Sequence, residues 1–118
     1  MAYRRLKYGN IPSNGHASRK ESRRAAQLQL WQKAGIISNL RQQVPFTLIP
    51  AQYGANGTDL KGRQTRVCIE RAVKYIADFV YDMDGKTIVE DTKGFRTPDY
   101  IIKRKLMLWV HDIQIREI

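Results

Sequence analysis

The sequence predicts an α/β fold in which helices flank a sheet, in the order helix, strand, strand, strand, helix, strand. Apolar residues recur at helical spacing between residues 18 and 35, a turn signal at Asp84-Gly85 separates two β-rich stretches, and residues 113–118 alternate in polarity. The length of 118 residues suits one compact domain. We therefore expect a single domain over residues 18–118.

Residues 1–17 differ in composition from the rest of the chain. They are polar, contain Gly, Asn and Pro, and lack both helical and alternating periodicity. Three basic residues stand near their start: Arg4, Arg5 and Lys7. The segment is predicted to form a basic N-terminal arm.

The first helix is predicted to follow Ser18 as its N-cap and to end at Gly35. Four residues share its inward face: Glu21, Ala25, Leu28 and Trp31. Ser18 and Glu21 also fit an S-x-x-E capping box, in which the glutamate bonds the backbone at the helix start. The residues alone leave both roles open for Glu21, the capping role and a place in a site.

Residues 44–50 are predicted to form a short apolar strand bracketed by Pro45 and Pro50. The following residues, 51–66, are rich in Gly, Asn and basic side chains and are too polar for a core. We expect them to form a loop.

Residues 68–94 are predicted to form an antiparallel pair of strands. The first strand reaches Tyr81, the Asp84-Gly85 pair is a hairpin signal, and the second strand runs from about Lys86 to Lys93. This pairing brings two segments that carry carboxylates next to each other.

A second helix is predicted with Thr97 as N-cap and Pro98 as its first residue. Its apolar stripe is expected to consist of three residues at helical spacing: Ile102, Leu106 and Trp109. Much of the remaining helix surface is basic because of Lys103, Arg104 and Lys105. The alternating residues 113–118 are expected to add the last strand.

The charge of the chain favours a polyanionic partner. Lys and Arg number 21 against 11 Asp and Glu, which gives a net charge of +10 and a pI of about 10.1. Such a balance points to nucleic acid before membrane. The single Cys68 allows neither an internal disulfide nor a thiolate zinc cluster, and no apolar run has the length of a membrane span. We therefore expect a cytoplasmic protein without a membrane partner.

Asp91-Thr92-Lys93 is the strongest candidate for chemistry. Because strand side chains alternate between faces, Asp91 and Lys93 point the same way and Glu90 points to the other face. Asp78 lies in the adjoining strand, where a lone carboxylate among apolar residues is costly unless it is paired or bound to metal. An antiparallel hairpin brings Asp78 beside Asp91.

These groups fit a magnesium-dependent phosphodiester hydrolase. The carboxylates of Asp78 and Asp91, with the backbone carbonyl of Thr92, are hard oxygen ligands of the kind that Mg²⁺ takes. Lys93 is placed to orient water or to stabilise charge on the phosphate, and Glu21 is a candidate fourth ligand. A structural ion pair between Asp78 and Lys93 at a strand end is the alternative.

The pattern resembles the PD-(D/E)xK nuclease superfamily, whose members have the restriction-endonuclease-like fold. The stretches "KYGN", "YIADFVY", "VEDTKG" and residues 18–50 are similar to a family of small phage proteins grouped with that superfamily. One departure is that Ala77, and not proline, precedes Asp78.

The resemblance implies an α-β-β-β-α-β core with a mixed central sheet flanked by helices. It implies Asp78 and Asp91 as metal ligands, Lys93 as catalytic, and Glu21 as the additional acid of the first helix found in junction-resolving members. Some members of the superfamily place a polar residue before the first strand, and Gln42 and Gln43 are both candidates for it.

The function expected is a Mg²⁺- or Mn²⁺-dependent endonuclease that cuts branched DNA such as Holliday junctions, acts as a homodimer in phage recombination, and works in a bacterial host cell. A nuclease that cuts or nicks duplex DNA, and a non-catalytic DNA-binding protein that retains the fold, are the alternatives. The candidate phosphate contacts are Arg4, Arg5, Lys7, Arg19, Lys20, Arg23, Arg24, Lys61, Arg63, Arg66, Lys103 and Arg104.

Overall fold

The computed structural model describes residues 16–118, so the predicted contacts Arg4, Arg5 and Lys7 lie outside the described residues. The elements are α1 (His16–Lys33), β2 (Ser38–Ile49), β3 (Gln52–Thr58), β4 (Gln64–Glu70), β5 (Val73–Met83), β6 (Lys86–Asp91), α2 (Pro98–His111) and β7 (Arg116–Glu117). The predicted mixture of helices and strands is confirmed. None of the helices within this part of the chain is long and apolar enough to cross a membrane.

The central sheet is mixed and has the strand order β2-β5-β6-β7. Both β2 with β5 and β5 with β6 pair antiparallel, whereas β6 and β7 pair in parallel. The turn between β5 and β6 forms where predicted: Asp84 and Gly85 have φ values of 53° and 76°. Two successive positive φ angles are the signature of a type I′ turn, which matches the twist of the flanking strands.

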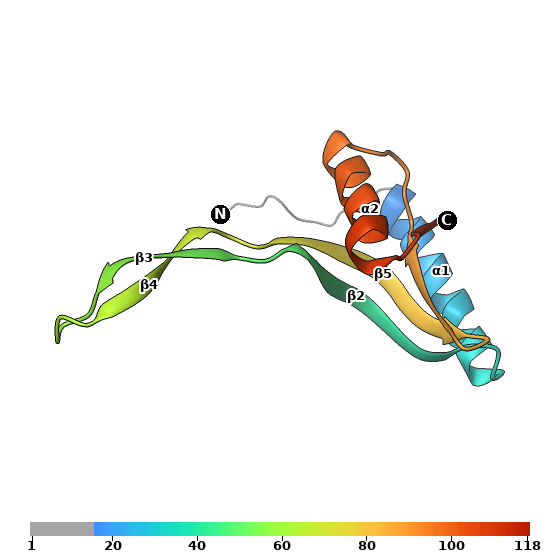
Figure 1. Cartoon of the computed structure of the whole chain (residues 1–118). Helices are drawn as coiled ribbons and strands as arrows, with labels where there is room; N and C mark the ends of the chain where they lie inside the picture. The colour runs from blue at the N-terminus through green and yellow to red at the C-terminus, as the bar shows by residue number, and fades with distance from the viewer. Residues whose placement is uncertain (1–15) are drawn as a thin grey trace, which may run out of the picture.

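Residues 51–66 do not form the predicted loop. They contribute to a separate two-stranded sheet, in which β3 pairs antiparallel with β4. Figure 1 shows this ribbon continuing β2 and β5 far beyond the helices, and we call it the β3–β4 ribbon. The prediction was wrong because it assumed that a strand must bury one face. A two-stranded ribbon is held together by backbone hydrogen bonds while solvent reaches both of its faces. At Gly57 the partner strand lies so close that a Cβ would stand 2.8 Å from Val67 Cγ2.

The strand boundaries also differ from those predicted. β2 begins at Ser38, six residues before the predicted strand 44–50. Pro45 lies inside β2, which is possible because β2 is the edge strand of its sheet. Residues 68–70 belong to β4, and β5 starts only at Val73.

Two apolar clusters lie against the central sheet, and one helix covers each. Val89 of β6 belongs to the cluster that contains Met107 of α2, and the neighbouring Ile88 packs against the cluster that contains Leu28 of α1. Because neighbouring strand residues point to opposite faces, α1 and α2 cover opposite faces of the sheet at β6. On α1 the predicted inward face is confirmed, with Leu28 fully buried.

On α2 the start is as predicted, but of the predicted apolar stripe only Leu106 packs against the core. Thr97 caps the helix, its side chain accepting a hydrogen bond from the Tyr100 backbone N–H at 3.2 Å. The buried residues are Tyr100 and Met107, while Ile102 and Trp109 are 58% and 85% exposed. The helix is apolar on two sides, so spacing alone did not select the inner one. Tyr100 is suited to burial because its hydroxyl reaches Glu117 of β7 at 2.7 Å.

Candidate active site

Asp91 is the last residue of β6 and is almost fully buried. Its Oδ2 accepts a hydrogen bond from the Tyr75 hydroxyl at 2.5 Å, and the Lys93 Nζ lies 3.5 Å from its Oδ1. Glu90 points to the opposite face, where it contacts Arg24 of α1. The predicted alternation is therefore confirmed: Asp91 and Lys93 meet on one face and Glu90 lies on the other.

Asp78 stands beside this pair, on β5. Its Oδ2 accepts hydrogen bonds from the Thr92 backbone N–H at 2.9 Å and from the Thr92 hydroxyl at 2.8 Å. Burial raises the pKa of Asp91, the hydrogen bond from Tyr75 lowers it, and the negative charge of Asp78 raises it, with a net pKa of about 6. Two carboxylates that interact in this way favour a proton or another cation between them.

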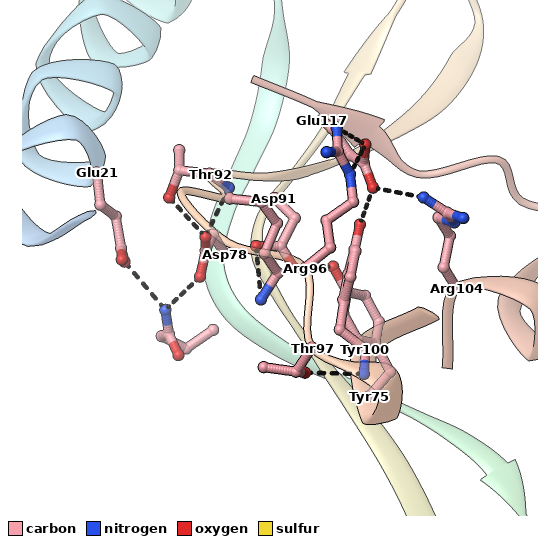
Figure 2. A network of polar contacts seen from close by, with 12 residues as sticks. Glu21, Tyr75, Asp78, Asp91, Thr92, Arg96, Thr97, Tyr100, Arg104 and Glu117 are labelled. Carbon is pink, nitrogen blue, oxygen red and sulfur yellow. Dashed lines mark hydrogen bonds and ion pairs between the residues drawn. The ribbon is translucent and has the colours of Figure 1, made fainter. Parts of the chain in front are cut away.

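Glu21 reaches the same region from α1. Figure 2 shows its side chain extending toward Asp78, with Thr92 and Asp91 next to them. The Gln43 Nε2 joins the two acids, lying 3.2 Å from Glu21 Oε2 and 3.4 Å from Asp78 Oδ1. Burial and the charge of Asp78 raise the pKa of Glu21 above its usual value.

The capping-box interpretation of Glu21 is not what the structure shows. The helix begins at His16, so Ser18 lies within its first turn and does not precede it. A capping box needs the serine at the N-cap position. The described partner of the Glu21 carboxylate is Gln43, on the neighbouring strand.

Gln42 and Gln43, the two candidates for a polar residue before the first strand, both lie inside β2, and Gln43 is the one that contacts the acidic residues of the site. It has a φ of 54°, which a residue with a side chain adopts at a cost. In β2 this conformation places the Gln43 amide between two carboxylates. Backbone strain at such a point is typical of functional sites.

Lys93 forms an ion pair in the structure, but its partner differs from the one in the ion-pair alternative. Lys93 pairs with Asp91 and not, as considered from the sequence, with Asp78. The Lys93 Nζ also lies 4.4 Å from the centre of the Tyr100 ring. The Lys93 ammonium is therefore held between Asp91 and the Tyr100 ring, with 28% of its side chain exposed.

The donor atoms present suit a hard divalent cation. Asp78, Asp91 and Glu21 supply carboxylates, and Thr92 adds a backbone carbonyl at the end of β6. Across residues 16–118, no three His, Cys, Asp or Glu side chains are drawn together as a formed metal site. Burial and Asp78 raise the pKa of Asp91, so the negative charge of this pair is unfavourable and a cation beside it would offset that charge.

The predicted phosphate contacts fall into two groups. Three are engaged within the protein: Arg24 with Glu90, Arg63 with Asp59 and Arg104 with Glu117. The others form no ion pair within the described part of the chain: Arg19, Lys20, Arg23, Lys61, Arg66 and Lys103. Arg66 lies over the Tyr53 ring on the β3–β4 ribbon, 4.9 Å from its centre.

Tyr75 was not identified as a site residue from the sequence. A tyrosine in an apolar strand is typical of a core position, and Tyr75 is in fact buried. Tyr75 belongs to the candidate site because its hydroxyl donates a hydrogen bond to Asp91, which lies 16 residues further along the sequence. No spacing in the sequence marks that contact.

Comparison with known proteins found one family and no individual relative. No curated protein and no solved structure matches the chain. The family described as "Protein of unknown function (DUF1064)" matches residues 3–117, which is nearly the whole chain. The chain therefore belongs to the DUF1064 family.

Proposed function

We propose that this protein is a metal-dependent endonuclease that hydrolyses phosphodiester bonds in branched DNA, with a restriction-endonuclease-like core. The observation that carries the proposal is the interacting pair Asp78 and Asp91, with the Lys93 Nζ 3.5 Å from Asp91 Oδ1. The two acids lie on neighbouring antiparallel strands between a first helix that carries Glu21 and a second helix. This order agrees with the implied α-β-β-β-α-β core once the β3–β4 ribbon is taken as an insertion.

Asp78, Asp91, the Thr92 carbonyl and Glu21 would hold Mg²⁺ or Mn²⁺. The ion would polarise the phosphodiester and lower the pKa of a bound water. Lys93 would stabilise the charge that develops on the phosphate, since it stands beside Asp91 and is partly exposed. Tyr75 would orient Asp91 through its hydroxyl. Gln43 would fix the distance between Glu21 and Asp78.

The DNA would contact the β3–β4 ribbon as well as the body of the protein. The ribbon projects from the sheet (Figure 1) and carries Lys61, Arg63 and Arg66. A two-stranded ribbon is narrow enough to enter the major groove of DNA. The basic residues would supply phosphate contacts that set affinity without reading sequence. Paired cuts on symmetric strands suit a homodimer.

The test is cleavage of three matched substrates, a four-way junction, a flapped duplex and a linear duplex, in Mg²⁺ and in chelator. We expect metal-dependent cleavage that is fastest on the junction. Equal rates on all three substrates would replace the junction assignment by a duplex-cutting or nicking nuclease.

Binding of DNA without any cleavage, in Mg²⁺ or in Mn²⁺, would favour the non-catalytic alternative. The observation behind that alternative is that Lys93 and Asp91 already satisfy each other as an ion pair. A metal titration followed by the fluorescence of the tryptophans separates the two cases, because a non-catalytic protein need not bind the ion.

A further inference from the structure

A second feature adjoins the candidate active site. A pocket of about 290 Å³ lies between β5 and the start of α2. This volume is close to the lower end of pockets that hold small ligands, about 300 Å³. It is lined by Lys74, Tyr75, Ile76, Lys93, Thr97, Asp99, Tyr100 and Lys103.

The pocket shares two residues with the candidate active site. The Tyr75 hydroxyl donates to Asp91 Oδ2 at 2.5 Å, and Lys93 pairs with Asp91 Oδ1. Figure 2 shows Tyr75, Thr97 and Tyr100 on the side of Asp91 away from Glu21. A group seated in the pocket is therefore next to Asp91, but on the side away from Glu21.

The charge in the pocket is positive. Three lysines, Lys74, Lys93 and Lys103, face one carboxylate, that of Asp99. Within residues 16–118 neither Lys74 nor Lys103 forms an ion pair. The ammonium groups of these two lysines have no ion-pair partner within the described residues. An anion with several acceptor oxygens, bound in the pocket, would neutralise both and accept their hydrogen bonds.

The pocket has a polar lining suited to an oxyanion. Thr97 is the N-cap of α2 and Asp99 lies in its first turn, where the helix dipole adds partial positive charge. The Tyr100 ring closes one side and lies under the Lys93 ammonium. A sulfonate or carboxylate ligand would also neutralise the positive charge of the pocket. Next to the proposed phosphodiester-cleaving site, however, the anion that the substrate supplies is phosphate.

The geometry points to a phosphate subsite: Lys74 and Lys103 bind a phosphate group of the nucleic acid next to the bond that is cut. The place of this subsite in the reaction rests on the proposed function, whereas its affinity for phosphate does not. The phosphate has two possible sources, an internal phosphodiester of the strand or a 5′-terminal phosphate. Neither lysine is required for the chemistry itself, so both are binding residues.

The experiment measures binding of short single-stranded oligonucleotides in chelator, by fluorescence anisotropy over a series of salt concentrations. The variants are Lys74→Gln, Lys103→Gln and the matched control Lys105→Gln. Lys105 is an exposed lysine of the same helix as Lys103 and does not line the pocket. Each oligonucleotide is used with and without a 5′-phosphate.

We expect each pocket variant to weaken binding by about tenfold or more relative to Lys105→Gln, the loss typical of one charge-assisted hydrogen bond. The slope of log K against log salt should become shallower by about 0.7 for each single-strand phosphate that the variant no longer neutralises. A loss that occurs only with the 5′-phosphate assigns the pocket to strand ends. A loss with both oligonucleotides assigns it to internal phosphates.

Losses no larger than that of Lys105→Gln on both oligonucleotides would overturn the subsite. Because the assay contains no metal and no cleavage, it reports on the pocket even if the protein proves not to be a nuclease. Conversely, suppose that the wild type cleaves junction DNA and that Lys74→Gln and Lys103→Gln bind oligonucleotides no more weakly than Lys105→Gln. This result would remove the subsite and leave the proposed function standing. Unchanged melting temperatures of the variants confirm that folding is not the cause.

Discussion

The Arg24 guanidinium of α1 donates two hydrogen bonds to the fully buried Glu90 carboxylate of β6, from Nε at 2.8 Å and from Nη2 at 2.6 Å. The Tyr81 hydroxyl donates to the same carboxylate. Glu90 precedes Asp91 in β6, and Arg24 lies three residues after Glu21 on α1. This contact therefore fixes the helix that carries Glu21 against the strand that carries Asp91.

Arg24→Met is expected to destabilise the protein by about 3–5 kcal/mol, because it leaves the charge of Glu90 buried and unpaired. Urea unfolding followed by circular dichroism measures the change. Arg23→Met is the matched control, since Arg23 is exposed and its substitution should cost no more than about 0.5 kcal/mol. Equal losses for the two variants would show that the Arg24–Glu90 pair does not hold α1 in place.

The hydrogen bonds of the Glu117 carboxylate lead us to expect that the protein loses stability in acid. Hydrogen bonds from Arg96, Tyr100 and Arg104 lower its pKa to about 2, from 4.5 in the absence of partners. A lowered pKa means that the folded state favours the carboxylate, so the contribution of Glu117 to stability is complete above pH 4.5 and is lost as the pH falls toward 2.

Thermal unfolding of the wild type and of Glu117→Gln, measured from pH 7 to pH 2, tests this contribution. The difference between their melting temperatures should be constant above about pH 5 and should shrink below it. Glu70→Gln, a change at an exposed position of the β3–β4 ribbon, is the matched control. A Glu117→Gln difference that stays constant down to pH 2 would contradict the role given to Glu117.

Lys93→Ala separates catalysis from structure. If Lys93 acts on the phosphate, cleavage should fall by about a hundredfold or more, while the melting temperature changes little because the side chain is partly exposed. The measurement is the single-turnover rate on junction DNA, beside a thermal scan. A lower melting temperature with undiminished cleavage would instead make the Lys93–Asp91 contact a purely structural ion pair.

Neutralising the ribbon should weaken DNA binding without changing the chemistry. For the triple change Lys61→Gln, Arg63→Gln and Arg66→Gln, we expect a shallower salt dependence, by about 0.9 in slope for each duplex phosphate that the ribbon no longer neutralises. The cleavage rate at saturating protein should be kept. The matched control neutralises Lys33, Lys86 and Lys105, which are exposed on the body of the protein. Equal effects of both triple variants would place the DNA path away from the ribbon.

Local signals in the sequence were sufficient to predict the strand pair around the candidate site. The Asp84-Gly85 turn requires two positive φ angles that these residues tolerate, and it fixes the register that pairs β5 with β6. Alternation along β6 then separates Asp91 from Glu90. The cap at Thr97 is equally local, because it depends on residues 97–100 alone.

Features that depend on partners distant in the sequence could not be predicted. Arg24 has the positive charge expected of a phosphate contact, and only the fold reveals that its partner is Glu90, 66 residues away. The largely polar residues 38–43 extend β2 through their pairing with β5, and only Leu40 among them packs against the core. The position of Gln43 between two acids depends on a strained φ, for which the sequence carries no signal.

The proposal that Asp91 belongs to a metal-dependent nuclease site is tested most directly by comparing wild type and Asp91→Asn on a labelled four-way junction, in Mg²⁺ and in chelator. The wild type should cut only in Mg²⁺. Asp91→Asn should lose cleavage by about a hundredfold or more, since even an outer partner of a metal ligand is worth about 10- to 100-fold. It should bind the junction as tightly as the wild type or more tightly, because a charge that repels phosphate has gone. Cleavage by Asp91→Asn at the wild-type rate, or wild-type cleavage that persists in chelator, would contradict the proposal.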